Sequence, residues 1–268
     1  MSQRTVDVRT HNRAAWNHEV ALGNAWTIPV DRETIRRARN GEFDLYITPS
    51  RPVPADWLPT QLAGVETLCL AGGGGQQGPL LAAAGARVTV FDNSDRQLER
   101  DRSVAQQNGL QLETVQGDMA DLSAFGDERF GLIVHPASNV YTPDVRRVWR
   151  EAFRVLAPSG TLVAAFDSPV RHIFDTESAE RGVLRVRHRL PYSDLKSLTP
   201  AELSHRFQTR EPLAFGHLLE DQIGGQIDAG FVITGFFEDR FGPRANDKLS
   251  YFMPTFAATR AIKTNRRA

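Results

Sequence analysis

The chain has 268 residues, 41% of them hydrophobic and 24% charged, which is enough for a large folded domain. Its 32 basic and 32 acidic residues give a formal net charge of zero, which argues against a nucleic-acid-binding protein. No apolar run reaches the roughly 20 residues of a membrane span, and residues 1–12 lack the apolar core of a secretion signal. We therefore expect a cytoplasmic protein whose partner is neither nucleic acid nor membrane. The oligomeric state is left open.

Residues 1–60 are expected to form an N-terminal arm. A helix is predicted over 33–39, and the proline-rich segment 48–54 that follows breaks both helix and strand. Such a segment usually crosses over a core. Three aromatic residues of the arm are candidates for closing a pocket: Trp16, Trp26 and Tyr46.

Strands alternate with helices over residues 61–168, the predicted core. Apolar runs predict strands over 65–70, 87–91, 112–115, 130–134 and 160–166. Helices are predicted over 79–84, between Ser94 as N-cap and Gly109 as the residue after the last turn, and from Thr142 with Pro143 in the first turn. This alternation predicts βαβ units and a parallel sheet, which binds ligands at the carboxyl ends of its strands.

The alternation stops over residues 169–216, which we interpret as an inserted substrate cap. Apolar and polar residues alternate over 182–190 and predict a strand with one exposed face. The rest of the core is expected over 217–262, with a helix near 218–229 and strands over 231–238 and 252–261. Residues 263–268 are basic and are expected to form a solvated tail.

Three motifs follow the first three predicted strands. Four glycines, 72–75, allow backbone to approach a ligand closely and turn into a helix. Asp92 ends the second strand, where a carboxylate suits a ribose diol. Gly117, Asp118 and Met119 follow the third strand, where Asp118 suits an adenine amino group and Met119 an apolar wall against the base. Together they predict a site for an adenosyl group.

With these motifs, residues 65–166 resemble the class I S-adenosylmethionine (SAM)-dependent methyltransferases, and the late strands extend the resemblance to about residue 261. The resemblance implies an α/β fold with a Rossmann-like parallel sheet and a late antiparallel strand. It implies SAM as cofactor and S-adenosylhomocysteine as product, with a small molecule as acceptor. By position it assigns the methionine part to Ala71, Gly72 and Gly73, the ribose to Asp92, and the adenine to Asp118 and Met119, with Asn93 and Gln97 near the base.

Two positions depart from the family pattern. Cys69 stands where the family often has an acid, and Ala71 stands at the first loop glycine. Backbone carbonyl groups can still bind the methionine ammonium, and Gln76 and Gln77 are candidates for its carboxylate. His135 follows the fourth strand and is expected to contact the cofactor or support its loop rather than to act as a base.

The catalytic residues are not defined by any motif. Candidate bases in and around the cap are His172, His188, Tyr192, His217 and Glu220, and each is more often structural than catalytic. No metal site is expected, because His135 replaces the aspartate that metal-dependent catechol methyltransferases carry at this strand end.

Two other functions fit parts of the sequence. Residues 73–78 match the G-x-G-x-x-G pattern of NAD(P)-dependent oxidoreductases, and Tyr192 and Lys196 match a Tyr-x-x-x-Lys pair. That pair lies in the cap, however, and the Gly-Asp-Met triplet favours SAM. A non-catalytic SAM-binding module is the third possibility.

Overall fold

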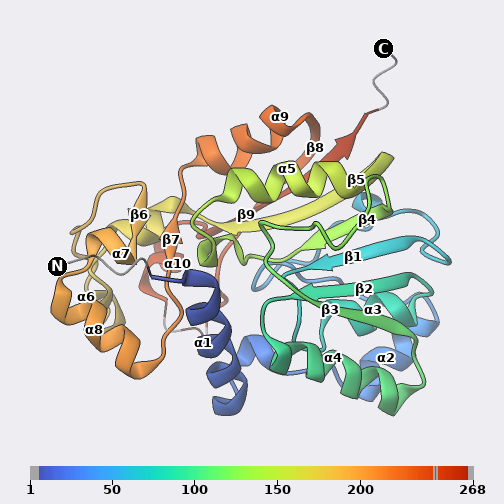
Figure 1. Cartoon of the computed structure of the whole chain (residues 1–268), viewed down its shortest axis with the longest axis horizontal. Helices are drawn as coiled ribbons and strands as arrows, with labels where there is room; N and C mark the ends of the chain where they lie inside the picture. Colours follow the sequence, from blue (N-terminus) through green and yellow to red (C-terminus); the bar gives the residue numbers. More distant parts are fainter. Residues whose placement is uncertain (1–5, 244, 246, 265–268) are drawn as a thin grey trace.

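The computed structural model describes residues 6–243, 245 and 247–264, which fold around a seven-stranded sheet (Figure 1). The strand order is β3-β2-β1-β4-β5-β9-β8. β9 runs opposite to the other six strands of this sheet, which confirms the predicted parallel sheet with a late antiparallel strand. The strands span Glu66–Leu70 (β1), Arg87–Asp92 (β2), Leu112–Gln116 (β3), Phe130–His135 (β4), Leu156–Asp167 (β5), Phe231–Asp239 (β8) and Phe256–Lys263 (β9).

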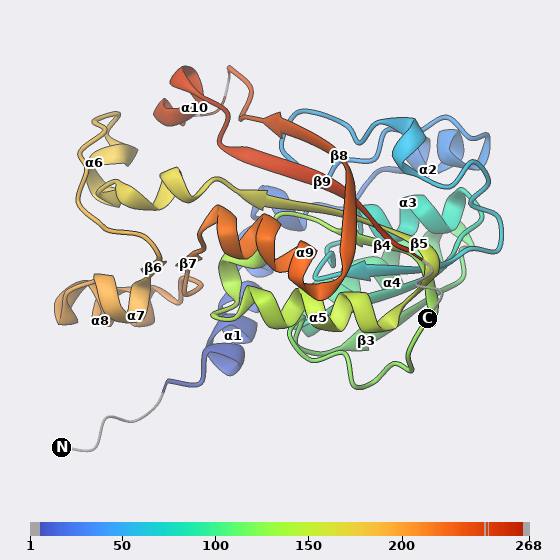
Figure 2. The same cartoon turned by 90° about the horizontal axis from the view of Figure 1, so that it is seen from above.

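Helices cover both faces of the sheet and bury two apolar layers (Figure 2). One face packs against α2 (Arg32–Arg39), α3 (Gln77–Ala83), α4 (Asp95–Asn108) and the segment 43–62. The other packs against α5 (Val145–Val155) and α9 (Gly225–Ala229). The strand order reverses between β1 and β4, the point where open α/β sheets bind ligands.

Two helix starts illustrate how local capping sets the elements. The predicted caps of α4 are confirmed: the Ser94 side chain accepts from the Gln97 N–H, and Gly109 is left-handed with φ 61°. The predicted start of α5 at Thr142 is wrong. Asp144 is the N-cap and accepts from the Arg147 N–H at 3.1 Å, so the helix begins at Val145.

Residues 169–216, here called the cap, contain short elements and a two-stranded sheet of β6 (Tyr192–Ser193) and β7 (Phe215–Gly216). The helices are α6 (Thr176–Glu180), α7 (Asp194–Ser197), α8 (Pro200–Thr209) and the 3-10 turn η4 (Pro169–Ile173). The predicted strand over 182–190 is wrong: this segment forms only an isolated bridge between Phe174 and Val186. Its alternating pattern finds no neighbouring strand with which to form a ladder.

The end of the chain differs from the prediction by a few residues. The expected helix near 218–229 is a π-helical turn, η5 (Glu220–Gly224), continued by α9. A short helix, α10 (Lys248–Phe252), precedes β9, so the last strand begins at 256 rather than 252. Lys263, which the sequence predicts to begin the tail, belongs to β9, where its buried ammonium donates to the carbonyl groups of Phe153 and Leu156. Residues 265–268 of that tail lie outside the described residues.

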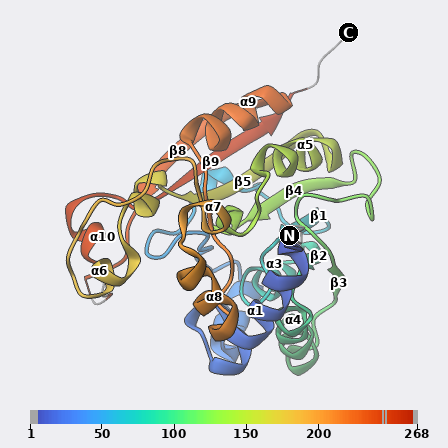
Figure 3. The same cartoon turned by 60° about the vertical axis from the view of Figure 1, so that its left-hand side comes forward.

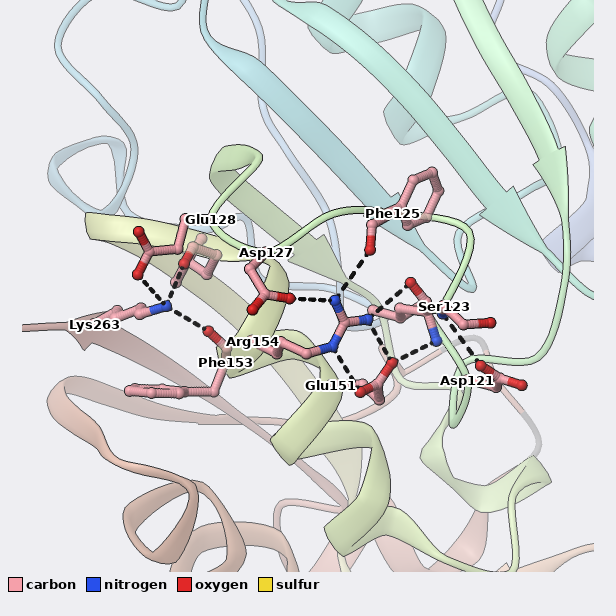
Figure 4. Close-up of polar contacts among 11 residues, drawn as sticks. Asp121, Ser123, Phe125, Asp127, Glu128, Glu151, Phe153, Arg154 and Lys263 are labelled. Carbon is pink, nitrogen blue, oxygen red and sulfur yellow. Dashed lines mark hydrogen bonds and ion pairs between the residues drawn. The ribbon is translucent and has the colours of Figure 1, made fainter.

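The loop between β3 and β4 is fastened to α5 by a charged cluster (Figure 4). Arg154 of α5 donates to the carbonyl groups of Leu122 and Phe125 and pairs with Asp127 at 2.8 Å. Glu151 accepts from the Leu122 N–H at 2.8 Å and also binds Arg154. These contacts fix the loop whose first residues are the Gly-Asp-Met triplet.

Residues 6–60, here called the arm, run between the core and the cap. Its first helix, α1 (Val8–Leu22), lies alongside both (Figure 3). The buried Asn12 side chain donates to the carbonyl groups of Tyr141 and Leu213 and accepts from the Leu213 N–H. Asn17 donates to Asp95 of α4 at 2.8 Å. Hydrogen bonds therefore join α1 to both sides of the molecule.

Candidate active site

A cavity of about 590 Å³ lies at the carboxyl ends of the parallel strands. Its walls come from the loops after β1, β2, β3, β4 and β5, and from the arm. Every predicted cofactor residue except His135 lines it. These residues are Ala71, Gly72, Gly73, Gln76, Gln77, Asp92, Asn93, Gln97, Gly117, Asp118 and Met119.

The glycine loop is packed too closely for side chains. The Gly73 N–H donates to Asp92 Oδ2 at 3.0 Å, and a Cβ added to Gly73 would lie 2.9 Å from the Cβ of Gln97. Ala71, where the family has glycine, adopts φ 47° in the left-handed region that favours glycine. The loop thus keeps the glycine-like backbone and leaves space at the cavity wall, so the residues present fit an adenosyl cofactor.

Asp92 is well placed to accept hydrogen bonds from hydroxyl groups. Its two oxygens accept one backbone N–H each, from Gly73 and from Ser94. A carboxylate offers about four lone-pair positions, so acceptor capacity remains for a diol. The side chain is 8% exposed, and burial raises the pKa of Asp92 to about 6.

The end of the cavity that is predicted to bind the base is formed by the loop after β3. Asp118 Oδ1 accepts from the Ala120 N–H at 2.9 Å, which orients the carboxylate. Gly117 lies against the buried Phe91 ring, and a Cβ there would be 2.0 Å from its Cζ. Asn93 lines the same cavity and donates to the Arg9 carbonyl at 2.8 Å, linking this end to α1.

The two glutamines after the glycine loop are also tied to the arm. Gln76 Nε2 donates to the Ile28 carbonyl at 2.9 Å, and Gln77 Nε2 donates to the Tyr46 carbonyl at 2.8 Å. Their expected contact with the methionine carboxylate stays a prediction. The sequence did not reveal their role in holding the arm.

The structure places His135 behind the cavity rather than in its wall. The side chain is fully buried, with Nδ1 2.7 Å from the Leu70 carbonyl and Nε2 2.8 Å from Asn139 Oδ1. Burial lowers the pKa of His135. Of its two expected roles, a cofactor contact and loop support, the geometry fits the second.

The aromatic residues of the arm lie where the sequence suggested. Trp16, Trp26 and Tyr46 all line the cavity. The Trp16 ring meets Tyr141 edge-on with centroids 5.0 Å apart, and the Trp26 ring lies 6.1 Å from Phe241.

Of the five candidate bases, only His172 lines the cavity. His217 is buried and its Nε2 lies 2.9 Å from the Thr142 carbonyl, and the Tyr192 hydroxyl donates to Asp194 inside the cap at 2.6 Å. His188 packs edge-on against Tyr192, and Glu220 lies beside Arg146 on the surface. These four are not placed to touch a ligand in the cavity.

Several cavity residues were not identified from the sequence. Asp167 ends β5, so the rule that strand ends carry ligand-binding residues is the signal that could have identified it. Arg171, Tyr141, Phe241 and Phe256 come from separate segments without a shared motif. Their proximity depends on the fold of the cap and the last strands.

Comparisons with known proteins agree on the class. The methyltransferase domain family matches residues 68–164. The methyltransferase YbaJ of Bacillus subtilis, itself uncharacterized, is 49% identical over 253 residues, covering 94% of this chain and 97% of its own. Two solved SAM-dependent methyltransferases share the fold. The one from Mesorhizobium loti is 18% identical with a TM-score of 0.59, and the match covers 77% of this chain and 94% of that one. The one from Methanosarcina mazei is 20% identical with a TM-score of 0.56, and the match covers 83% of this chain and 99% of that one.

The chain therefore belongs to the class I SAM-dependent methyltransferases, and its cofactor is SAM. Tyr192 and Lys196, which suggested an oxidoreductase, do not line the cavity. No helix among the described residues has the length and apolarity needed to cross a bilayer.

Proposed function

We propose that this methyltransferase acts on a small-molecule acceptor. The supporting observation is that one cavity gathers the three motif loops and also extends past them to the cap. Its volume of about 590 Å³ is typical of small-molecule sites, which span roughly 300–1,000 Å³. Trp26 of the arm and Phe241, whose rings lie 6.1 Å apart, also line this cavity, which favours a small acceptor over a macromolecular one.

The proposal divides the cavity between two ligands. Gly72, Gly73 and Asp92 would hold the methionine and ribose parts of SAM, and Asp118 and Met119 its adenine. The acceptor would then lie beyond the glycine loop, near Asp167 and His172 at the start of the cap. The arm would cover both ligands, since it supplies Trp16, Trp26 and Tyr46 to the wall.

Bound SAM supplies an electrophilic methyl group, so the protein has mainly to align and desolvate the acceptor. Positioning of this kind is worth up to about 7–11 kcal/mol of the barrier. The packed glycine loop and the hydrogen-bonded arm are rigid features suited to that task.

Calorimetric titration of the full chain tests the cofactor site. We expect SAM and S-adenosylhomocysteine to bind with micromolar or better affinity, and NAD to bind at least about 100-fold more weakly. Equal affinity for NAD would contradict the proposed division of the cavity. A screen of metabolite pools for masses increased by one methyl group then tests whether the acceptor is a small molecule.

A further inference from the structure

A carboxylate and an imidazole form a close pair at the acceptor end of the cavity. Asp167 is the last residue of β5, and His172 lies in η4 of the cap. Asp167 Oδ2 and His172 Nε2 are 2.6 Å apart, both residues line the cavity, and each side chain is 13% exposed. The pair is thus largely removed from water yet reachable from the cavity.

The imidazole is held in one orientation. The His172 ring stacks on Tyr192 with centroids 5.6 Å apart, and the Tyr192 hydroxyl is fixed by Asp194. A Cβ added to Gly216 would lie 2.6 Å from the His172 ring, so glycine is required beside it. With Nε2 directed at Asp167, Nδ1 of His172 has no hydrogen-bond partner among the described residues.

The neighbouring positive charge is already neutralised. Arg171 pairs with Asp247 at 2.8 Å, and its guanidinium lies over the rings of Phe241 and Phe256 at 5.3 and 5.2 Å. The remaining cavity cation, Arg9, is at the opposite end, where its backbone binds Asn93. The Asp167 carboxylate therefore has no arginine partner in the described part of the chain.

The walls around this carboxylate are aromatic. Tyr141 is half-buried, and its desolvation together with the Asp167 charge raises its pKa, so the phenol stays neutral. Trp16 packs edge-on against Tyr141, and Phe256 pairs with Asp167 across β5 and β9. A partly desolvated carboxylate among aromatic rings favours a cation over an anion.

We propose that the methyl acceptor is an amine on a planar apolar body, whose ammonium group donates to His172 Nδ1 and transfers a proton to it, while Asp167 holds the other ring nitrogen and supplies the negative charge that favours the cation. This inference rests on the proposed function. The proton leaves nitrogen for His172 Nδ1, and the freed nitrogen lone pair forms the bond to the methyl carbon. The bond from that carbon to sulfur breaks, and its electron pair stays on sulfur.

The first test compares three probes of one shape on the full chain saturated with S-adenosylhomocysteine. Calorimetry measures the binding of 2-phenylethylamine, 2-phenylethanol and 3-phenylpropionate. We expect the amine to bind at least about tenfold more tightly than the other two. Asp167→Asn should abolish that preference, whereas Asp56→Asn, which changes an exposed aspartate outside the cavity, should retain it.

Several results would overturn the inference: no binding of any probe, no preference for the amine, or an unchanged preference in Asp167→Asn. The affinity for S-adenosylhomocysteine is measured in every variant. Its retention shows that the variants are folded, whereas its absence from the wild-type protein would count against the proposed function instead.

The second test addresses proton transfer. Nitrogen NMR of histidine-labelled protein, with the His172 signals assigned by their loss in His172→Gln, reports which ring nitrogen carries the proton. We expect Nε2 to be protonated and Nδ1 bare at pH 8. A neutral ring protonated on Nδ1 would contradict the assigned role, because no lone pair would then be free to accept the proton.

Discussion

Gly117 shows how one residue without a side chain shapes the end of the cavity that is proposed to bind the base. The Phe91 ring fills the space that a side chain at position 117 would need, since an added Cβ would lie 2.0 Å from the ring's Cζ. Phe91 is 1% exposed and packs edge-on against Phe125 at 5.3 Å, so it has no room to move. The position of Asp118 therefore depends on the residue before it.

We expect Gly117→Ala to destabilise the protein by about 1–3 kcal/mol through overpacking and to weaken SAM binding. Denaturant unfolding and calorimetry measure the two effects. The control is Gly126→Ala in the same loop, where an added Cβ has nothing within 4 Å. If Gly117→Ala unfolds like the control, the described packing against Phe91 is wrong.

A second residue-scale feature lies beneath the glycine loop. Asp101 of α4 is fully buried; its Oδ2 accepts from the Gly74 N–H at 2.9 Å, while Oδ1 has no partner in the described part of the chain. Burial, with a contribution from the nearby Asp92 charge, raises the pKa of Asp101 from about 3.8 to about 7.

This raised pKa makes a prediction about stability. The folded state holds the proton more tightly than the unfolded state, so the stability that Asp101 contributes is present below about pH 4 and is lost as the pH rises to about 7. Asp101→Asn removes the buried charge and supplies an amide donor. Urea unfolding at pH 5 and pH 8 should show the variant gaining stability over wild type at the higher pH. An identical difference at both values would refute the raised pKa.

At the scale of elements, buried strands were the easiest to predict. β1, β2 and β4 are short, mostly apolar segments with nearly every residue buried, and α4 has a serine at one end and a glycine at the other, so their local signals agree with their packing. Residues 182–190 alternate just as a strand would, but a strand also needs a neighbour, which local sequence does not specify. The predicted start of α5 was wrong because Thr142 and Asp144 are both good caps. In the fold the Thr142 carbonyl lies 2.9 Å from His217 Nε2, and Asp144 caps the helix.

The wall of the proposed cofactor half of the cavity could be predicted from the sequence, because each motif directly follows a strand and parallel strand ends meet at one edge. The acceptor half could not. Asp167, Tyr141 and Phe256 are brought together by the pairing of β5 with β9 and by the arm. Two of the histidines proposed as bases, His188 and His217, do not line the cavity. Local sequence does not show that a histidine such as His217 is buried with its ring nitrogen beside backbone carbonyl groups.

At the scale of the whole molecule, the arm joins two parts that the cavity separates. α1 contacts the cofactor side through Asn17 and Asp95 and the cap side through Asn12 and Leu213, and His11 Nε2 lies 2.9 Å from the Glu211 carbonyl of the cap. Under the proposed division of the cavity, the arm would cover both the cofactor and the acceptor, and the carboxyl edge of the sheet would form their common floor.

That common floor requires Asp92 and Asp118 to bind the same adenosyl group. The most direct test is calorimetric titration of S-adenosylhomocysteine into Asp92→Ala, Asp118→Ala and the exposed control Asp56→Asn. Each lost hydrogen bond to a charged group is worth about 1.5–3 kcal/mol, so we predict affinity losses of roughly 10- to 100-fold in the first two variants and none in the control. Wild-type affinity in both alanine variants, with the proteins folded, would contradict the shared site.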